Sequence, residues 1–247
     1  MKTCWKQNVA GAFDRQADCY DLHAQIQTHA AARLAEALPA LDAPVILEIG
    51  CGTGALSEIL TTRYPKGRFY VSDISPSMIA RTKARLAQTH PQNDMSLIVM
   101  DGETPCFAGR PFDLVVGNMS AQWFHDPAGG LARLCGLLKP GGTLFYSVPG
   151  PDNFHQWRSV LELLELPSGL LELPPLPGLF DEERIPVRYE GAYDFLRRVK
   201  SSGAGTAKAG YDPLAPGALR KACRLFDARF DAAADWHILY GRLEARS

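Results

Sequence analysis

The chain has 247 residues, of which 46% are hydrophobic and 21% charged, enough to bury a core in one large α/β domain or a domain with an insertion. Its net charge of −1 gives no overall field that attracts nucleic acid, and no stretch approaches the roughly 18 consecutive apolar residues of a membrane-spanning helix. The first residues also lack the apolar block of a signal peptide. We therefore expect a cytoplasmic protein without a nucleic-acid or membrane partner.

The six cysteines form no CxxC pair, and neither they nor the six histidines have the spacing of a zinc site. We expect free thiols and no bound metal. The charge is unevenly distributed, because the segment from Arg184 to Arg224 carries nine basic residues against three acidic ones. This locally basic segment is a candidate surface for an acidic partner.

Two helices are expected first, since apolar residues recur at helical spacing from residue 9 to 38, with a break near Cys19 and Tyr20 and an end at Pro39. Strands and helices then alternate. The strands are expected in PVILEIG, RFYVSDI, MSLIVMD, FDLVVGN and GTLFYSVP, and the helices at 55–64, 76–88 and 130–138. Strands rich in Val, Ile, Phe and Leu with helices between them predict a parallel sheet covered on both faces.

After Pro149 the pattern changes. Residues 167–186 concentrate prolines and glycines and predict a loop-rich insertion. The segment 187–193 could form a strand, followed by a helix at 192–204 that Gly203 ends, a helix at 216–230 and a last strand at 234–246. The expected organisation is amino-terminal helices at 1–42, a ligand-binding core at 43–150, an insertion or substrate lid at 151–210, and a last helix and strand at 211–247.

Three glycines, Gly50, Gly52 and Gly54, follow the first expected strand at every second position. Glycines there let the chain turn sharply and let a ligand pack against bare backbone, while the next helix offers unpaired N–H groups. The spacing is not the GxGxxG of dinucleotide folds, and no GxxxxGK[ST] motif is present. A nucleotide-like ligand without a pyrophosphate is therefore favoured, with a tight turn that holds no ligand as the alternative.

Acidic residues end the next two expected strands. Asp73 lies where an acid can accept hydrogen bonds from both hydroxyls of a ribose, and Asp101 lies where a carboxylate could accept a hydrogen bond from an adenine amino group. Met78 and Met100 are near enough in sequence to flank the adenine ring. The alternatives are that Asp73 caps a turn and that Met78 belongs to the core.

Together, EIGCGTG, SDISPSM, MDGETPCF, FDLVVGN and LLKPGGTLFYSVPG resemble the class I S-adenosylmethionine-dependent methyltransferases. The resemblance implies a doubly wound, Rossmann-like α/β fold. Its sheet would have seven mostly parallel strands in the order 3-2-1-4-5-7-6, with the last strand antiparallel. S-adenosylmethionine would be the cofactor and S-adenosylhomocysteine the product. The residues implied to hold the cofactor are Tyr20, Glu48, Gly50, Gly52, Gly54, Asp73, Met78, Asp101, Gly102 and Asn118.

A narrower resemblance rests on Asn118-x-x-x-Gln122-Trp123, which is similar to the N-x-x-x-Q-W signature of the malonyl-acyl-carrier-protein O-methyltransferases of biotin synthesis. The amino-terminal helices with Tyr20 and the stretches FHQWRSVL, DFLRRVKSSGA and WHILYGRLEA also resemble that family. The resemblance implies methylation of the free carboxylate of a malonyl thioester on acyl-carrier protein or coenzyme A. Tyr20, Gln122 and Trp123 are the candidate catalytic residues, and Gln122 and Trp123 are also expected to contact the substrate.

This chemistry needs no general base, because a carboxylic acid with a pKa of about 4 is almost fully ionised at pH 7. A cation that fixes the carboxylate is expected instead, and Arg197, Arg198 and Lys200 of the insertion are the candidates. The same basic segment suits docking of an acidic carrier protein. Between Trp157 and Phe195 the chain looks shorter than many members of this family. The alternatives are a methyltransferase for another small carboxylic acid and a non-catalytic S-adenosylmethionine-binding partner protein.

Overall fold

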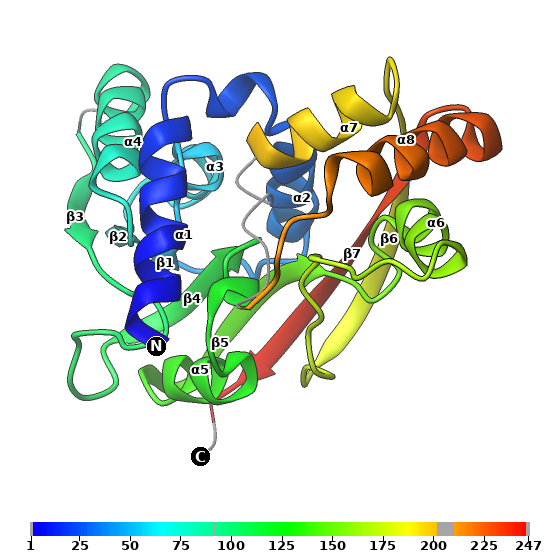
Figure 1. Cartoon of the computed structure of the whole chain (residues 1–247). Helices are drawn as coiled ribbons and strands as arrows, with labels where there is room; N and C mark the ends of the chain where they lie inside the picture. The colour runs from blue at the N-terminus through cyan, green and yellow to red at the C-terminus, as the bar shows by residue number, and fades with distance from the viewer. Residues whose placement is uncertain (1, 91, 202–209, 246–247) are drawn as a thin grey trace.

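The computed structural model describes residues 2–90, 92–201 and 210–245, and its centre is one seven-stranded sheet (Figure 1). The strand order is β3-β2-β1-β4-β5-β7-β6. β7 runs antiparallel to β5 and β6, and the other pairings are parallel. The strands are β1 (Val45–Ile49), β2 (Arg68–Asp73), β3 (Asp94–Val99), β4 (Phe112–Asn118), β5 (Leu138–Pro149), β6 (Leu179–Arg188) and β7 (Ala233–Glu244). The expected strand order and the antiparallel last strand are confirmed.

Helices precede, connect and follow these strands. They are α1 (Lys2–Gln16), α2 (Gln25–Glu36), α3 (Ala55–Arg63), α4 (Pro76–Thr89), α5 (Pro127–Cys135), α6 (His155–Leu163), α7 (Ala192–Val199) and α8 (Pro216–Phe230), with short 3-10 turns η1 (Tyr20–Leu22) and η2 (Ala121–Trp123). Ser75 caps α4 and Asp126 caps α5, each by accepting a backbone N–H, and a proline follows each cap. The Asp126 cap explains why α5 begins and ends three residues before the expected 130–138. No helix in the described part of the chain is long and apolar enough to cross a membrane.

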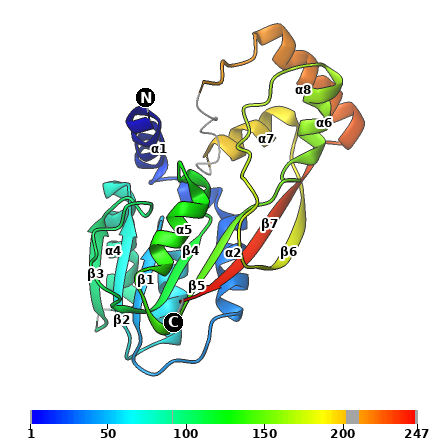
Figure 2. The same cartoon turned by 90° about the horizontal axis from the view of Figure 1, so that it is seen from below.

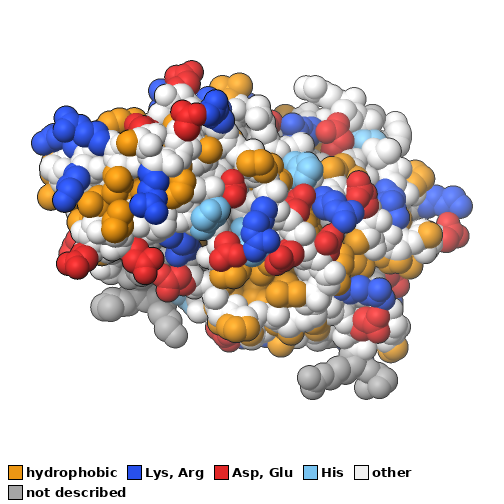
Figure 3. Space-filling model, turned by 90° about the vertical axis from the view of Figure 1, so that its right-hand side faces the viewer, with side chains coloured by type: hydrophobic (Ala, Val, Ile, Leu, Met, Phe, Trp, Pro, Cys, Tyr) orange, Lys and Arg blue, Asp and Glu red, His pale blue; other side chains and the backbone are white. Residues whose placement is uncertain are grey.

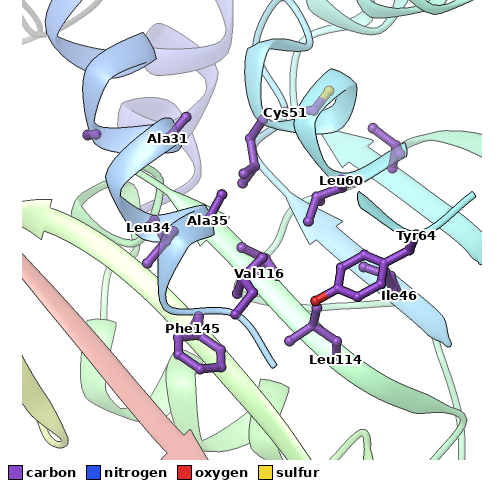
Figure 4. Close-up of a cluster of buried hydrophobic side chains, with 14 of the residues drawn as sticks. Ala31, Leu34, Ala35, Ile46, Cys51, Leu60, Tyr64, Leu114, Val116 and Phe145 are labelled. Atoms are coloured by element: carbon purple, nitrogen blue, oxygen red, sulfur yellow. The ribbon is translucent and has the colours of Figure 1, made fainter. Parts of the chain in front are cut away.

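The central strands are buried on both faces because helices pack on each side, and successive strand residues point to opposite sides. Leu114 and Val116 of β4 pack with α2 and α3, whereas Val115 between them packs with α5. Figure 4 shows the first of these clusters, where Ala31 and Leu34 of α2 meet the strands. The expected two-sided parallel core is therefore present.

A third cluster lies beyond the parallel strands, where α6, α7 and α8 pack together with β7. Trp157, Phe195, Phe226 and Trp236 are its large buried side chains. Figure 2 shows these three helices and α1 at the same end of the sheet. The carboxyl ends of the parallel strands thus lie between two helical segments that are far apart in the sequence.

The expectation of a loop-rich segment at 167–186 and a strand at 187–193 is wrong in part, because β6 begins at Leu179 and ends at Arg188. β6 is an edge strand, so Pro186 can lack an N–H without breaking an inner ladder. Its charged residues pair across the surface: Arg33 with Asp181, His29 with Glu183, and Arg184 with Asp152. Figure 3 shows acidic and basic side chains interleaved on this side of the molecule. Charge therefore hid the strand pattern.

Other boundaries agree closely with the sequence. α8 has the expected bounds, and α3 and α4 each end within one residue of the expected position. α7 ends at Val199, while Gly203, expected to end that helix, lies outside the described residues, as does residue 246 of the expected last strand. The insertion thus keeps both a strand and a helix.

Candidate active site

A first cavity with an empty volume of about 950 Å³ lies at the carboxyl ends of β1, β2 and β4. Open α/β sheets bind ligands at this edge, where the strand order reverses beside β1. The expected residues in its wall are Tyr20, Glu48, Gly50, Gly52, Asp73, Asp101, Gly102, Asn118 and Trp123. Segments from α1 and the β1–α3 loop thus surround one volume.

A side chain at each of the three glycines would meet different surroundings. All have positive φ, but a Cβ on Gly50 would come within 2.5 Å of Ser120 Cβ, and one on Gly54 would lie 3.1 Å from Thr82. A Cβ on Gly52 would meet nothing nearer than the Tyr20 ring at 3.9 Å. Of the three, Gly52 alone has open space where a Cβ would stand. Gly54 caps α3 and does not line the cavity, so its expected ligand contact stays a prediction.

Asp73 ends β2 with its carboxylate held by two backbone groups. Oδ2 accepts a hydrogen bond from Gly52 N at 2.9 Å, and Oδ1 accepts one from Ser75 N at 2.9 Å. Burial raises the pKa of this carboxyl to about 6. The glycine loop and the acid of β2 are thus one rigid unit, and the carboxylate faces the cavity already oriented.

Glu48 is a second buried acid in the wall, with Ser57 Oγ donating to it at 2.6 Å. Burial raises the pKa of Glu48 to about 8. Tyr20 also lines the first cavity. Burial, together with the nearby Asp73 and Asp21, raises the pKa of its hydroxyl. Tyr20 is therefore a neutral hydroxyl at pH 7, and the buried acids leave the cavity suited to a cation.

The carboxylate of Asp101 is already engaged. Its Oδ2 lies 2.5 Å from Lys6 Nζ, which also lies 2.5 Å from Glu103, and its Oδ1 accepts Glu103 N at 3.0 Å. Lys6 therefore ties α1 to this end of the cavity. Met100 lines the cavity, but Met78 is fully buried outside its wall. Met78 therefore belongs to the core, which was the alternative given for it in the sequence analysis.

A second cavity with an empty volume of about 560 Å³ adjoins the first. The two share the wall residues Phe13, Tyr20, Gln27, Met119 and Trp123. The second cavity is otherwise lined by Gln122, Pro149, Asn153, Phe154, Arg158, Leu170, Leu171 and Trp236. Two ligands in these cavities would meet at the shared aromatic wall.

Several buried oxygens near the shared wall have no partner. Gln122 Nε2 donates to Met119 O at 2.6 Å, which leaves Gln122 Oε1 unpaired, and Gln27 Oε1 and Ser120 Oγ are also unpaired. Buried polar atoms are usually satisfied, so unpaired amide oxygens beside a cavity favour a ligand group that donates hydrogen bonds.

The side-chain amide of Asn118 is not free. It donates to Gln27 O at 2.9 Å and accepts from Ser147 Oγ at 2.7 Å. Asn118 therefore lines the first cavity while it joins α2 to β4 and β5. Its amide holds the wall in place.

The three cations expected to hold a substrate carboxylate lie elsewhere. Arg197 and Arg198 both pair with the buried Asp194, at 2.6 and 2.9 Å, and neither they nor Lys200 lines either cavity. The structure therefore does not bring these three cations into the wall of either cavity. Arg158 of α6 lines the second cavity instead, and the sequence reasoning missed it. The stretch FHQWRSVL contained it, but nothing in its spacing distinguished this arginine from a surface charge.

No group of three metal-ligating side chains comes together in residues 2–90, 92–201 and 210–245.

Comparison with known proteins gives the family. A family profile described as a methyltransferase domain matches residues 46–142. The biotin biosynthesis bifunctional protein BioCD of Bordetella avium is 36% identical over 96% of this chain and 52% of that protein, so the chain spans about half the length of this relative. The malonyl-[acyl-carrier protein] O-methyltransferase of Magnetococcus marinus is 34% identical over 90% of this chain and 87% of that protein.

A solved structure supports the fold independently. A methyltransferase in complex with the Trm112 activator of Haloferax volcanii has a TM-score of 0.55 and 17% identity, with 95% of this chain and 98% of that chain covered. At this identity the likeness concerns the fold alone. On the sequence identity to full-length relatives, the chain belongs to the malonyl-[acyl-carrier protein] O-methyltransferase family.

Proposed function

We propose that this chain transfers the methyl group of S-adenosylmethionine to the free carboxylate of a malonyl thioester on acyl-carrier protein. The product is the methyl ester, formed at an early step of biotin synthesis. The observation that carries the proposal is the pair of adjoining cavities, which share Tyr20 and Trp123. The names of the relatives supply the substrate class.

The residues of the first cavity fit the donor. The pre-oriented carboxylate of Asp73 suits two ribose hydroxyls, and the open backbone at Gly52 suits close approach of the methionine part. Buried Glu48 suits a positively charged ligand. Asp101 would accept from the adenine amino group while it also holds Lys6, so the amino-terminal helix takes part in donor binding.

When bound, the donor supplies an electrophilic methyl group. A carboxylate oxygen forms the new C–O bond as the C–S bond breaks, and the positive and negative charges of the two reactants disappear together. A site that excludes water favours this loss of charge. Phe13 and Trp123 pack edge to face at 5.7 Å in the shared wall and keep water from the junction. The chain thus acts by positioning and desolvation, without a base.

Docking of the carrier protein is assigned to α8. Arg220, Lys221 and Arg224 are exposed on this helix, and no ion pair is recorded for them among the described residues. In contrast, Arg197 and Arg198 share one buried carboxylate, that of Asp194. α8 packs with α6, whose Arg158 lines the second cavity, so a carrier bound there lies on the acceptor side.

The test is to incubate the protein with S-adenosylmethionine and malonyl-carrier protein and to record the mass of the acyl group. The proposal expects a gain of one methylene unit. Acetyl-carrier protein, which has no free carboxylate, is the matched control and should gain nothing. A protein that binds S-adenosylhomocysteine but leaves the malonyl group unchanged would contradict the proposal, and a panel of other small acids would then separate a different acceptor from a non-catalytic protein.

A further inference from the structure

The acceptor cavity needs a cation, because a carboxylate leaves water only when its charge is compensated. In the described wall of the second cavity, Arg158 is the one charged side chain. It stands on α6, which adjoins α7 and α8 on the opposite side from α1 (Figure 2). The cavity therefore presents a single positive group to an anion that enters it.

The guanidinium of Arg158 is oriented by the backbone. Nε donates to Asn153 O at 3.0 Å and Nη2 donates to Leu171 O at 3.1 Å. Both carbonyls belong to segments that line the same cavity. These neutral acceptors fix the plane of the guanidinium without neutralising its charge.

No acid neutralises Arg158 at hydrogen-bond distance among the described residues. The nearest recorded carboxylate is Glu172, with its oxygen 4.0 Å from Nη1 and its side chain 67% exposed. Burial lowers the pKa of Arg158, which reflects the cost of holding this charge away from water. By contrast, Arg197 lies 2.6 Å from the buried Asp194. Arg158 can therefore accept an external carboxylate without losing a close ion pair.

Two unpaired amide oxygens limit where an anion can bind in this cavity. Gln122 Oε1 and Gln27 Oε1 are buried acceptors in the cavity wall. A carboxylate is also only an acceptor, so these oxygens repel it while Arg158 attracts it. Arg158 is therefore the one charged side chain that the described wall of this cavity offers to an acceptor anion, next to the wall shared with the donor cavity.

We propose that Arg158 binds and orients the carboxylate of the methyl acceptor and determines the preference for an acidic acyl group. This role rests on the proposed function. A guanidinium can hold a carboxylate with parallel hydrogen bonds and leave a lone pair for attack. The residue determines specificity by contact with substrate and moves no proton.

The experiment compares Arg158→Gln, Arg158→Lys and the matched control Arg197→Gln, all with malonyl-carrier protein. Loss of a partly buried charge pair predicts a KM raised about 30-fold or more in Arg158→Gln. In Arg158→Lys, which keeps the charge without the planar guanidinium, the KM should rise about 5-fold. Arg197→Gln should stay within about 2-fold, because it has an internal partner. The affinity for S-adenosylhomocysteine should be unchanged in all three variants.

A second readout separates binding from a structural effect. Guanidinium ion at low millimolar concentration should restore part of the activity of Arg158→Gln and leave that of Arg197→Gln unchanged. Unchanged KM in both Arg158 variants would overturn this inference and leave the proposed function intact. If Arg158→Gln fails to bind S-adenosylhomocysteine, its fold is damaged, and the KM of Arg158→Lys for malonyl-carrier protein then tests the inference. A wild-type protein without activity on malonyl-carrier protein would instead contradict the proposed function.

Discussion

The two cavities differ in how the chain builds them. The core of the donor cavity comes from contiguous motifs at strand ends, with Gly52, Asp73 and Gly102 in one sheet edge. The acceptor cavity collects Phe13, Met119, Arg158 and Trp236 from widely separated segments. The first is therefore readable as a motif, whereas the second exists only once α1, α6 and β7 have packed.

This difference has an energetic side. The donor loop is held by its own backbone geometry, since Gly50, Gly52 and Gly54 all have positive φ. The acceptor wall is held by packing and by hydrogen bonds between distant segments, such as Asn118 to Gln27. Changes in the loop should therefore damage the fold itself, while changes in the acceptor wall should alter substrate selection.

The largest expected effect is on stability. Gly50→Ala forces a Cβ to within 2.5 Å of Ser120 Cβ at φ +66, and we expect it to lower the free energy of unfolding by about 3 kcal/mol or more. Gly109→Ala is the matched control, since φ there is +74 with nothing within 4 Å, and should cost about 1 kcal/mol. Urea unfolding measures both. Equal losses would show that packing against Ser120 does not matter.

The next effect is on donor binding. Asp73→Ala removes the carboxylate assigned to the ribose, and we expect the Kd for S-adenosylhomocysteine to rise about 100-fold. Asp94→Ala, at the start of β3 and paired with Arg68 on the surface, should change the Kd less than about 2-fold. Calorimetric titration measures both. A Kd that stays the same in Asp73→Ala would remove the sugar-binding role.

A smaller effect is expected on the acceptor side. Replacing Arg220 and Arg224 with glutamate should raise the KM for malonyl-carrier protein about 10-fold. High salt should reduce this difference from wild type, because it screens the charges. With malonyl-pantetheine, which lacks the protein, the KM should stay within about 2-fold. Arg68→Glu, on β2 near the opposite edge of the sheet, is the charge control. Equal effects on both substrates would place the carrier elsewhere.

The smallest expected effect is the release of a proton when the donor binds. Burial raises the pKa of Glu48 to about 8, so the unliganded folded protein keeps this carboxyl protonated at pH 7 while the unfolded chain does not. Glu48 therefore makes the unliganded fold less stable as the pH rises from the usual carboxyl range towards 8. A cationic donor favours the ionised form, so binding should release a proton from Glu48.

Titration in two buffers with different ionisation enthalpies measures this release. Wild type should release more protons than Glu48→Gln at pH 7, and the difference should shrink above pH 8. Any proton lost by the donor itself is common to both proteins and cancels. No difference between the two would show that Glu48 does not respond to the ligand charge.

The sequence predicted the fold and the family through residues at strand ends, and the strand order and the family are confirmed. It could not distinguish Gly52, which opens onto the cavity, from Gly50 and Gly54, which are needed for packing, because all three share one motif. The binding roles of these residues stay predictions.

Three features could not be predicted from the local sequence. The pattern of β6 was hidden because an edge strand alternates half-covered and exposed residues, many of them charged. Local charge density points to Arg197, Arg198 and Lys200 in the basic segment, whereas the place of Arg158 beside a cavity depends on tertiary packing. Met78 sits at helical spacing near Asp73, but Ser75 caps its N–H and the side chain points into the core. Proximity in sequence did not give proximity to the ligand.

The most direct measurement of the two-cavity account is a crystal structure with S-adenosylhomocysteine and malonyl-pantetheine bound together. The account predicts the nucleoside against Gly52 with its ribose on Asp73, and the malonyl carboxylate in the second cavity on Arg158, across the wall formed by Tyr20 and Trp123. A malonyl group seated outside the second cavity, with the nucleoside in the first, would contradict it.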